Sequence, residues 1–270
     1  MTSGATPWPR LRWRSGPINP QLEHGERDIP DETPIALTYD ASTYAVMMAT
    51  PRDLEDFALG LSLTEGVVSS AADIRDIEIV ENELGIEARM WLAPGHREAL
   101  ATRRRRLAGP TGCGLCGIDS LTEAARNPPE VSAGLRLSPE DILAAMAALT
   151  PAQALGERTR AVHAAGFWKP GAGLVKLRED VGRHNALDKL AGALARADQV
   201  GAEGAVLLTS RVSVEMVQKT AVIGAPILIA VSAPTAFAVR TAEAAGLTLV
   251  AVARSDGFEV FTHPERIALP

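Results

Sequence analysis

The chain has 270 residues, of which 46% are hydrophobic and 22% are charged, an ordinary composition for a soluble globular protein. Its 33 acidic and 27 basic residues give a net charge of −6, which argues against a general nucleic-acid binder. Two cysteines cannot staple a chain of this length, so a secreted protein built on disulfides is excluded. Residues 1–16 lack the apolar run of a signal peptide, and no later stretch reaches membrane-spanning length. We therefore expect a cytoplasmic protein with reduced thiols, no membrane contact and no nucleic-acid partner.

The first part of the chain predicts an arm followed by a small subdomain. Residues 1–30 are rich in proline, glycine and charge, which is typical of a flexible arm. Residues 31–110 are expected to form a smaller α+β subdomain, because strand-like and helix-like patterns follow one another there. Its expected elements, in chain order, are a hairpin over 34–50, a helix over 51–66 and a strand pair over 73–93.

Residues 131–270 predict the main α/β domain. After a helix over 138–151 that begins at Ser138 and stops at Pro151, and two strands within 159–179, apolar strands alternate with single helices. Such a pattern indicates a parallel or mixed sheet covered on both faces. Ligands of such sheets bind beyond the carboxyl ends of the strands. The expected later strands are 205–210, 226–232, 247–254 and 258–263, with helices after residue 185, around 214–221 and up to Ala245.

Both cysteines lie in "GPTGCGLCG", at positions 113 and 116, in a segment over 111–130 that is expected to be a mobile loop. A structural zinc site needs four ligands, and none of the five histidines has the matching spacing, so we expect no bound metal. A redox pair usually opens a helix directly after a strand, whereas basic and glycine-rich residues precede Cys113. Two inert buried thiols would not explain the flanking glycines.

A nucleophilic role remains for the cysteine pair. The basic run Arg103–Arg106 would lower the pKa of a neighbouring thiol and raise its thiolate fraction, although such a run is by default a solvated loop. A thiolate on a loop can accept sulfur from a donor persulfide and pass it to an acceptor. On chemistry alone, sulfur transfer ranks only slightly above redox exchange.

Three predicted helix starts at the carboxyl ends of strands carry polar residues. In "REDVGRHNALDKL" over 178–190, Arg183 and His184 fit an anion site, although an N-terminal cap followed by a solvated helix face is locally the simpler interpretation. Arg211 and Ser213 stand at the second start, and "SAPT" over 232–235 forms the third. No P-loop or G-x-G-x-x-G fingerprint occurs. The three starts together predict a ligand pocket at one edge of the sheet.

Several of these strings resemble the FdhD family, the sulfur-carrier proteins required for formate dehydrogenase activity. The resemblance covers about residues 30–270, and its most specific part is "EDVGRHNALDK", whereas "CGLCG" alone would not be specific. The other matching strings are "AVMMATPRDLEDFALGLSLTEG", "TSRVSVEMVQK", "PILIAVSAPT", "AEAAGLTLV" and "FTHPERI".

The resemblance implies a sulfurtransferase mechanism. A cysteine desulfurase would load a persulfide onto Cys113, with Cys116 as its partner, and the sulfur would pass to the molybdenum of the bis-molybdopterin guanine dinucleotide cofactor used by formate dehydrogenase. The implied fold is similar to the cytidine deaminase three-layer α/β sandwich with a mixed sheet and a smaller added domain, and the implied assembly is a homodimer. The deaminase zinc signature is absent, so deamination is not implied.

The resemblance also implies a cofactor-binding segment at Val252, Ala253, Arg254, Ser255, Asp256 and Gly257. Family members often carry R-G-D-R there, so Arg254 and Asp256 match and the second cation is missing; Arg183 or Arg211 is available to replace it. Two alternatives stay open. The protein would act as a chaperone that binds and inserts the cofactor without using its cysteines, or as a binding module structured by zinc.

Overall fold

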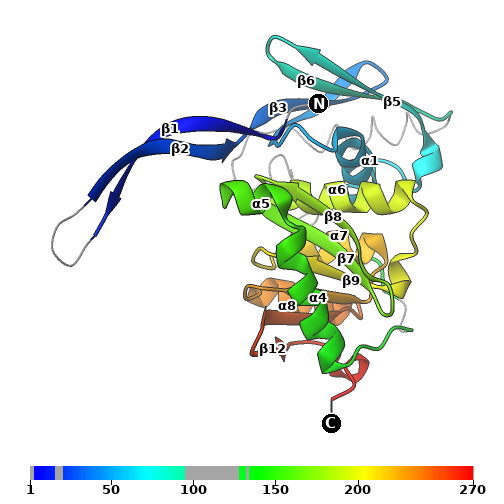
Figure 1. The fold of residues 1–270 in the computed structure, drawn as a ribbon. Coiled ribbons are helices and arrows are strands. Elements are labelled where there is room, and N and C mark those ends of the chain that lie inside the picture. The colour runs from blue at the N-terminus through cyan, green and yellow to red at the C-terminus, as the bar shows by residue number, and fades with distance from the viewer. Residues whose placement is uncertain (1–2, 16–20, 95–127, 132–133, 270) are drawn as a thin grey trace.

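The computed structural model describes residues 3–15, 21–94, 128–131 and 134–269. They form a long hairpin arm, a small sheet with one helix, and a larger sheet with helices on both faces (Figure 1). None of the helices in these residues is long and apolar enough to cross a membrane. The remainder of the expected subdomain and most of the expected loop, over 95–127, lie outside the described residues.

Two antiparallel strands, β1 (Ala5–Arg14) and β2 (Gln21–Pro30), form an arm that projects from the body of the protein (Figure 1). The composition of this segment had predicted no strands. Pro7 and Pro9 lie two residues apart, so their missing N–H groups fall on one edge of β1 and leave the edge that pairs with β2 intact. The segment expected to be a flexible arm is therefore a paired β-ribbon in its described residues.

A four-stranded sheet in the order β4-β3-β6-β5 and the helix α1 (Leu54–Thr64) form the small subdomain. Its strands are β3 (Thr33–Tyr39), β4 (Ser42–Ala49), β5 (Ile74–Asn82) and β6 (Gly85–Leu92). The predicted hairpin, helix and strand pair are confirmed. Apolar side chains of α1 and of one sheet face share a buried core, which includes Ile35, Leu37, Phe57, Leu61 and Met90.

The main sheet has six strands in the order β12-β11-β10-β9-β7-β8. Strands β9, β10 and β11 are parallel, and β7 and β12 run against them, so the predicted mixed sheet is confirmed. Because β8 is antiparallel to β7, strands β8 to β11 all end at one edge of the sheet. The strands are β7 (His163–Lys169), β8 (Gly173–Asp180), β9 (Ala205–Leu208), β10 (Ile227–Ala230), β11 (Thr248–Arg254) and β12 (Gly257–Val260).

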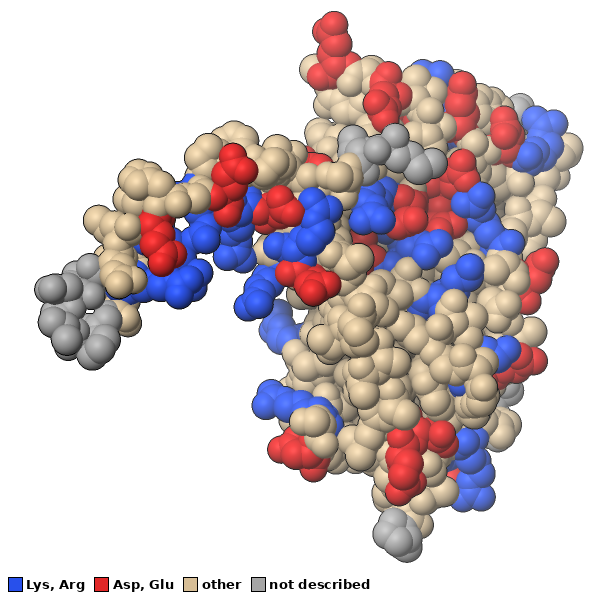
Figure 2. Space-filling view, in the orientation of Figure 1, with Lys and Arg blue, Asp and Glu red and all other residues tan. Residues whose placement is uncertain are grey.

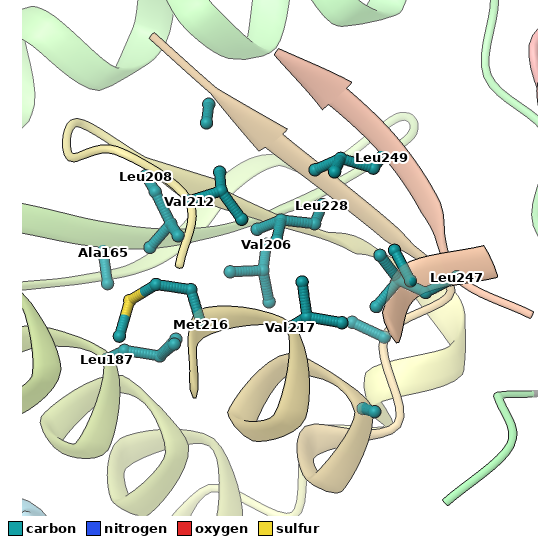
Figure 3. Close-up of a cluster of buried hydrophobic side chains, with 14 of the residues drawn as sticks. Ala165, Leu187, Val206, Leu208, Val212, Met216, Val217, Leu228, Leu247 and Leu249 are labelled. Carbon is teal, nitrogen blue, oxygen red and sulfur yellow. The ribbon is translucent and has the colours of Figure 1, made fainter. Parts of the chain in front are cut away.

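Helices cover both faces of this sheet. Helices α6 (Arg183–Arg196), α7 (Val214–Ile223) and α8 (Ala236–Ala244) share a core with one face, and α4 (Pro139–Ala152) packs on the other. Figure 3 shows Leu187, Met216 and Val217 of these helices facing Val206 and Leu228 of the sheet. The main part of the protein is therefore a three-layer α/β sandwich; its likeness to cytidine deaminase stays a prediction.

Helix α4 begins at the capping residue that the sequence predicted, Ser138. Ser138 Oγ accepts a hydrogen bond from the Asp141 N–H at 3.1 Å, and the Asp141 carboxylate accepts one from the Ser138 N–H. The helix ends one residue beyond the expected stop at Pro151. A short helix that the sequence analysis did not anticipate, α5 (Ala154–Thr159), follows directly.

Helices α1 and α6 cross in direct backbone contact and thereby join the two sheets. A Cβ atom added at Gly60 would lie 1.7 Å from the carbonyl oxygen of Asp188, and one at Gly192 would lie 1.9 Å from that of Asp56. Only glycine permits so close an approach. The crossing fixes the small subdomain against the main domain.

A fully buried ion pair lies beside this crossing. Lys189 Nζ is 2.6 Å from the Asp180 carboxylate, and both side chains are 0% exposed. Asp180 also accepts hydrogen bonds from the N–H groups of Thr50 and Gly182 and from Asn185 Nδ2, and Lys189 donates to the Thr50 carbonyl. Burial lowers the pKa of Lys189, and the facing Asp180 opposes that change. The pair ties the segment after β4 to the start of α6.

A second buried pair joins α6 to α7. Lys219 Nζ lies 2.7 Å from the Asp188 carboxylate, to which Thr64 Oγ1 of α1 also donates at 2.6 Å. Because Asp188 and Lys189 are 1% and 0% exposed, the interpretation of 178–190 as a cap followed by a solvated helix face is wrong for these two residues. Several of their partners, such as Thr50, Thr64 and Lys219, come from elements distant in the chain, which a local pattern does not contain.

Substitution of Lys189→Met should lower the free energy of unfolding by about 3–5 kcal/mol, because it leaves the Asp180 charge buried without its cation. Urea unfolding followed by circular dichroism measures this change. The control is Lys169→Met, which removes an exposed ion pair with Glu203 and should change the free energy by less than about 1 kcal/mol. Similar losses in both variants would contradict the assigned role of the buried pair.

Substitution of Gly192→Ala should lower the free energy of unfolding by at least about 2 kcal/mol, because α1 and α6 must move apart to admit a methyl group. Scanning calorimetry measures the shift. Gly134→Ala is the control, since no atom lies within 4 Å of a Cβ at that position. A Gly192→Ala protein with unchanged thermal stability would refute the close crossing.

Candidate functional site

The two cysteines, Cys113 and Cys116, and the basic run Arg103–Arg106 lie outside the described residues. Their expected roles therefore stay predictions. Within the described residues, the candidate site is the edge of the main sheet where β8 to β11 end and where α6, α7 and α8 begin.

The predicted cofactor-binding segment, 252–257, forms the end of β11 and the turn into β12. Arg254 pairs with Gly257 across the turn, and Arg254, Ser255 and Asp256 are exposed. Ala253 differs, because it is 1% exposed and belongs to the core beneath α4. The exposed side chains that this segment offers to a ligand are thus one guanidinium, one hydroxyl and one carboxylate.

Val252 has a strained backbone. Its φ is 52°, in the left-handed region that β-branched residues rarely adopt, at a cost on the order of 1–3 kcal/mol. The strain coincides with a bulge, since the pairing of β11 with β12 shifts between Ala251 and Arg254. The Val252 N–H donates to the carbonyl of Ser232, which follows β10. This bond holds the segment close to the loop that leads into α8.

Two of the three helix starts at this edge lack a side-chain cap. The N-cap residues of α6 and α7, Gly182 and Ser213, make no side-chain capping bond. Thr235 differs, because its hydroxyl accepts the Ala238 N–H and so caps α8 itself. The first N–H groups of a helix carry partial positive charge and favour anions. The starts of α6 and α7 are therefore the better candidates for an anion.

Four buried polar atoms without a hydrogen-bond partner gather at these two helix starts. They are Arg183 Nε, His184 Nε2, Ser213 Oγ and Glu215 Oε2, four of the six such atoms in the described part of the chain. Buried polar atoms in folded proteins nearly always have a partner, so this concentration fits a site for a polar ligand or for ordered water. Three of the four belong to groups that can donate a hydrogen bond.

His184 and Glu215 face each other across this cluster. Their nearest side-chain atoms, Nε2 and Oε2, are 4.0 Å apart, and the imidazole lowers the pKa of Glu215 to about 2. The pKa of His163, at the start of β7, is lowered by burial and by the positive charge of Arg183. Neither Glu215 nor His163 was predicted from the sequence as a site residue. The available signal for Glu215 was a carboxylate in the first turn of a helix that was already expected to lie at a ligand pocket.

The arrangement fits a ligand that carries phosphate groups. Arg183, the N-termini of α6 and α7, and the exposed Arg211 and Arg254 supply positive charge and hydrogen-bond donors along one edge. Glu215 and Asp256 supply acceptors for the hydroxyl or amino groups of such a ligand. Within the described residues, no three His, Cys, Asp or Glu side chains are grouped so that they could hold a metal ion.

Comparisons with known proteins agree over most of the chain. A protein of Agrobacterium fabrum, named "Sulfur carrier protein FdhD", is 54% identical over 246 residues, which are 91% of each chain. A protein of Cupriavidus necator with the same name is 49% identical over 256 residues, 95% of this chain and 88% of its own. This chain is thus similar in sequence to both proteins.

A solved structure from Desulfotalea psychrophila, of a protein proposed to be a formate dehydrogenase accessory protein, has a TM-score of 0.73 and 28% sequence identity. The match covers 97% of this chain and 99% of that one. The model of the FdhD/NarQ family matches residues 30–268, which hold the four-stranded sheet, the six-stranded sheet and the candidate site. With that match and relatives up to 54% identical, the chain belongs to the FdhD/NarQ family.

Proposed function

We propose that this protein is a sulfur carrier that serves the maturation of formate dehydrogenase. Cys113 accepts sulfur from a cysteine desulfurase as a persulfide, with Cys116 as its partner, and passes it to the molybdenum of the bis-molybdopterin guanine dinucleotide cofactor. In the first step the Cys113 thiolate attacks the terminal sulfur of the donor persulfide, a new S–S bond forms, and the desulfurase thiolate leaves. The reducing cytoplasm is the compartment that keeps the acceptor thiol available.

The proposal rests on the names of the relatives taken together with the number of cysteines in this chain. Relatives up to 54% identical are named sulfur carrier proteins. This chain has only two cysteines, so a persulfide on it can form only at Cys113 or Cys116. The sulfurtransferase activity is assigned to that pair for this reason.

The residues at the edge of the main sheet would hold the acceptor cofactor, which is the substrate of the transfer. Its phosphates suit Arg254, Arg183 and the uncapped first turns of α6 and α7, and its hydroxyl and amino groups suit Asp256. The strained backbone at Val252 presents this segment in one conformation, which reduces the ordering needed on binding. These residues bind and orient the acceptor, and the cysteine pair supplies the sulfur.

A second candidate function is a chaperone that binds and inserts the cofactor without a covalent step. The observation that favours it is that the groups suited to phosphate gather at a single edge of the sheet, at residues 182–183, 213 and 254. The two functions differ in whether a cysteine ever carries sulfur. That difference is directly measurable.

Incubation with a cysteine desulfurase and cysteine should add one reducible sulfur atom to the wild-type protein, located within residues 109–121. Intact-protein and peptide mass spectrometry measure the gain. The Cys113→Ala variant should show none, because it lacks the nucleophile, whereas the matched Cys116→Ala variant should still gain sulfur. A folded wild-type protein that gains no sulfur from an active desulfurase would support the chaperone instead.

Substitution of Arg254→Ala should raise the dissociation constant for guanosine diphosphate, the phosphate-bearing half of the acceptor, by about tenfold, because a charge-assisted hydrogen bond contributes about 1.5–3 kcal/mol. Isothermal titration calorimetry measures the constant. Arg136→Ala is the control, since Arg136 is exposed and lies outside the site. Unchanged affinity in Arg254→Ala would remove segment 252–257 from the binding site.

A further inference from the structure

One guanidinium and two imidazoles gather where α6 starts and β7 begins. Arg183 and His184 are the first two residues of α6, and His163 is the first residue of β7. The register of β7 and β8 brings His163 opposite Asp180, which precedes α6 directly. All three residues are partly buried. Three side chains that can carry positive charge therefore share one end of the main sheet.

This cluster lacks acceptors for its hydrogen-bond donors. Arg183 Nε and His184 Nε2 are buried and have no hydrogen-bond partner. A guanidinium only donates hydrogen bonds and keeps its proton at any physiological pH, so Arg183 needs an acceptor. The carboxylate of Asp180 does not supply one, because it is engaged by Lys189 and by three further hydrogen bonds. The cluster is suited to an external group that is rich in acceptors.

The charges around the cluster balance while both histidines are neutral. The positive charge of Arg183 is matched by Glu215, which faces His184 at 4.0 Å and stays ionised because the imidazole lowers its pKa to about 2. The buried pair of Asp180 and Lys189 adds no net charge. A diphosphate ester brings a negative charge on each phosphate, so its binding leaves the site negative unless a proton enters with it.

His163 is placed to accept that proton. Burial lowers the pKa of His163 below the usual value for histidine, and the positive charge of Arg183 lowers it further. The other groups that face it are Asp180 of β8, which opposes this change, and His184 of α6, which adds to it. An anion bound to Arg183 offsets the charge of that guanidinium, so the pKa of His163 rises in the complex.

Positive charge continues along the surface next to His163. Arg158 and Arg160 lie in the segment that leads into β7, and both are exposed. They line a groove of about 790 Å³ beneath the β1–β2 arm. Figure 2 shows Lys and Arg side chains gathered along the lower side of the arm and on the body beneath it. This field attracts anions toward the start of β7 and does not favour a proton on His163 until an anion arrives.

We propose that a diphosphate binds to Arg183, His184 and His163 together with one proton from the solvent, which His163 takes up. The imidazole of His163 thereby gains a positive charge and a second N–H donor, and no covalent bond forms. The proposal rests on the acceptor-binding role proposed for this edge of the sheet, and it adds that the protein holds its ligand more tightly as the pH falls. Release of the diphosphate returns the proton to the solvent.

Isothermal titration calorimetry of the full-length protein with guanosine diphosphate mannose tests the proposal. The second phosphate of this probe is esterified, so it lacks the second ionisation that a phosphate monoester has at a pH of about 6. The dissociation constant of the wild type should rise by about tenfold from about pH 6 to about pH 8, because His163 loses its proton in the complex over this range. Titrations near neutral pH in buffers of different ionisation enthalpy should show proton uptake on binding.

The decisive variant is His163→Gln, which keeps a polar side chain but cannot take up a proton. Its dissociation constant should be the same at both pH values and close to that of the wild type at the higher one. The matched control is His24→Gln, on the exposed arm strand β2, which should keep the pH dependence of the wild type. Circular dichroism should show that both variants are folded.

Three results would overturn the proposal, and they are distinguishable. Binding that neither depends on pH nor takes up a proton would refute the proposal and leave the acceptor site in place. A pH dependence that His184→Gln abolishes and His163→Gln keeps would refute the assignment to His163. A folded wild type that binds no probe at either pH would refute the acceptor site itself, whereas sulfur loading of the cysteines, measured by mass spectrometry, is independent of all three.

Discussion

The buried Asp180 carboxylate is the constraint on which the two halves of this protein depend. It has no contact with water, so its charge must be balanced by the Lys189 ammonium and by hydrogen bonds from Thr50, Gly182 and Asn185. These donors come from both halves of the chain. They can satisfy the carboxylate together only when the small subdomain sits in one orientation against α6. The pair therefore specifies how the halves meet, whatever its net contribution to stability.

The crossing of α1 and α6 has the complementary role of setting their separation. Gly60 and Gly192 bring each backbone against the other, so the helices cannot slide without losing contact or colliding. Because α6 is fixed this way along its middle, its first turn is fixed as well. That turn carries Arg183 and His184 to the edge of the sheet, opposite Glu215 of α7. The geometry of the candidate site thus follows from packing contacts made one to three turns away.

The sequence predicted the elements whose signals are local. The alternation over 34–50, the apolar face of the helix at 54–61 and the capping residue Ser138 each depend on neighbours within a few residues, and each was found where expected. The arm strands were not predicted, because proline and glycine usually break strands and no pattern states which edge of a strand is paired. The burial of Lys189 was not predicted either. Its partner Asp180 is near in sequence, but Thr50, which contacts both side chains, is distant in sequence.

Residues 178–190, the segment most specific to the family, differ from the residues to which the chemistry is assigned. Its later members, Asp188 and Lys189, lie inside the joint between the two halves, and only its first turn faces the sheet edge. A segment that both packs between the two halves of the protein and contributes to a binding site should tolerate few substitutions. Such a segment is a specific marker of the fold. A thiol carrier needs only a reachable sulfur on a loop, so its local sequence has no periodicity to constrain it. The most diagnostic part of the chain therefore identifies the scaffold, whereas the proposed sulfur chemistry depends on two cysteines elsewhere in the sequence.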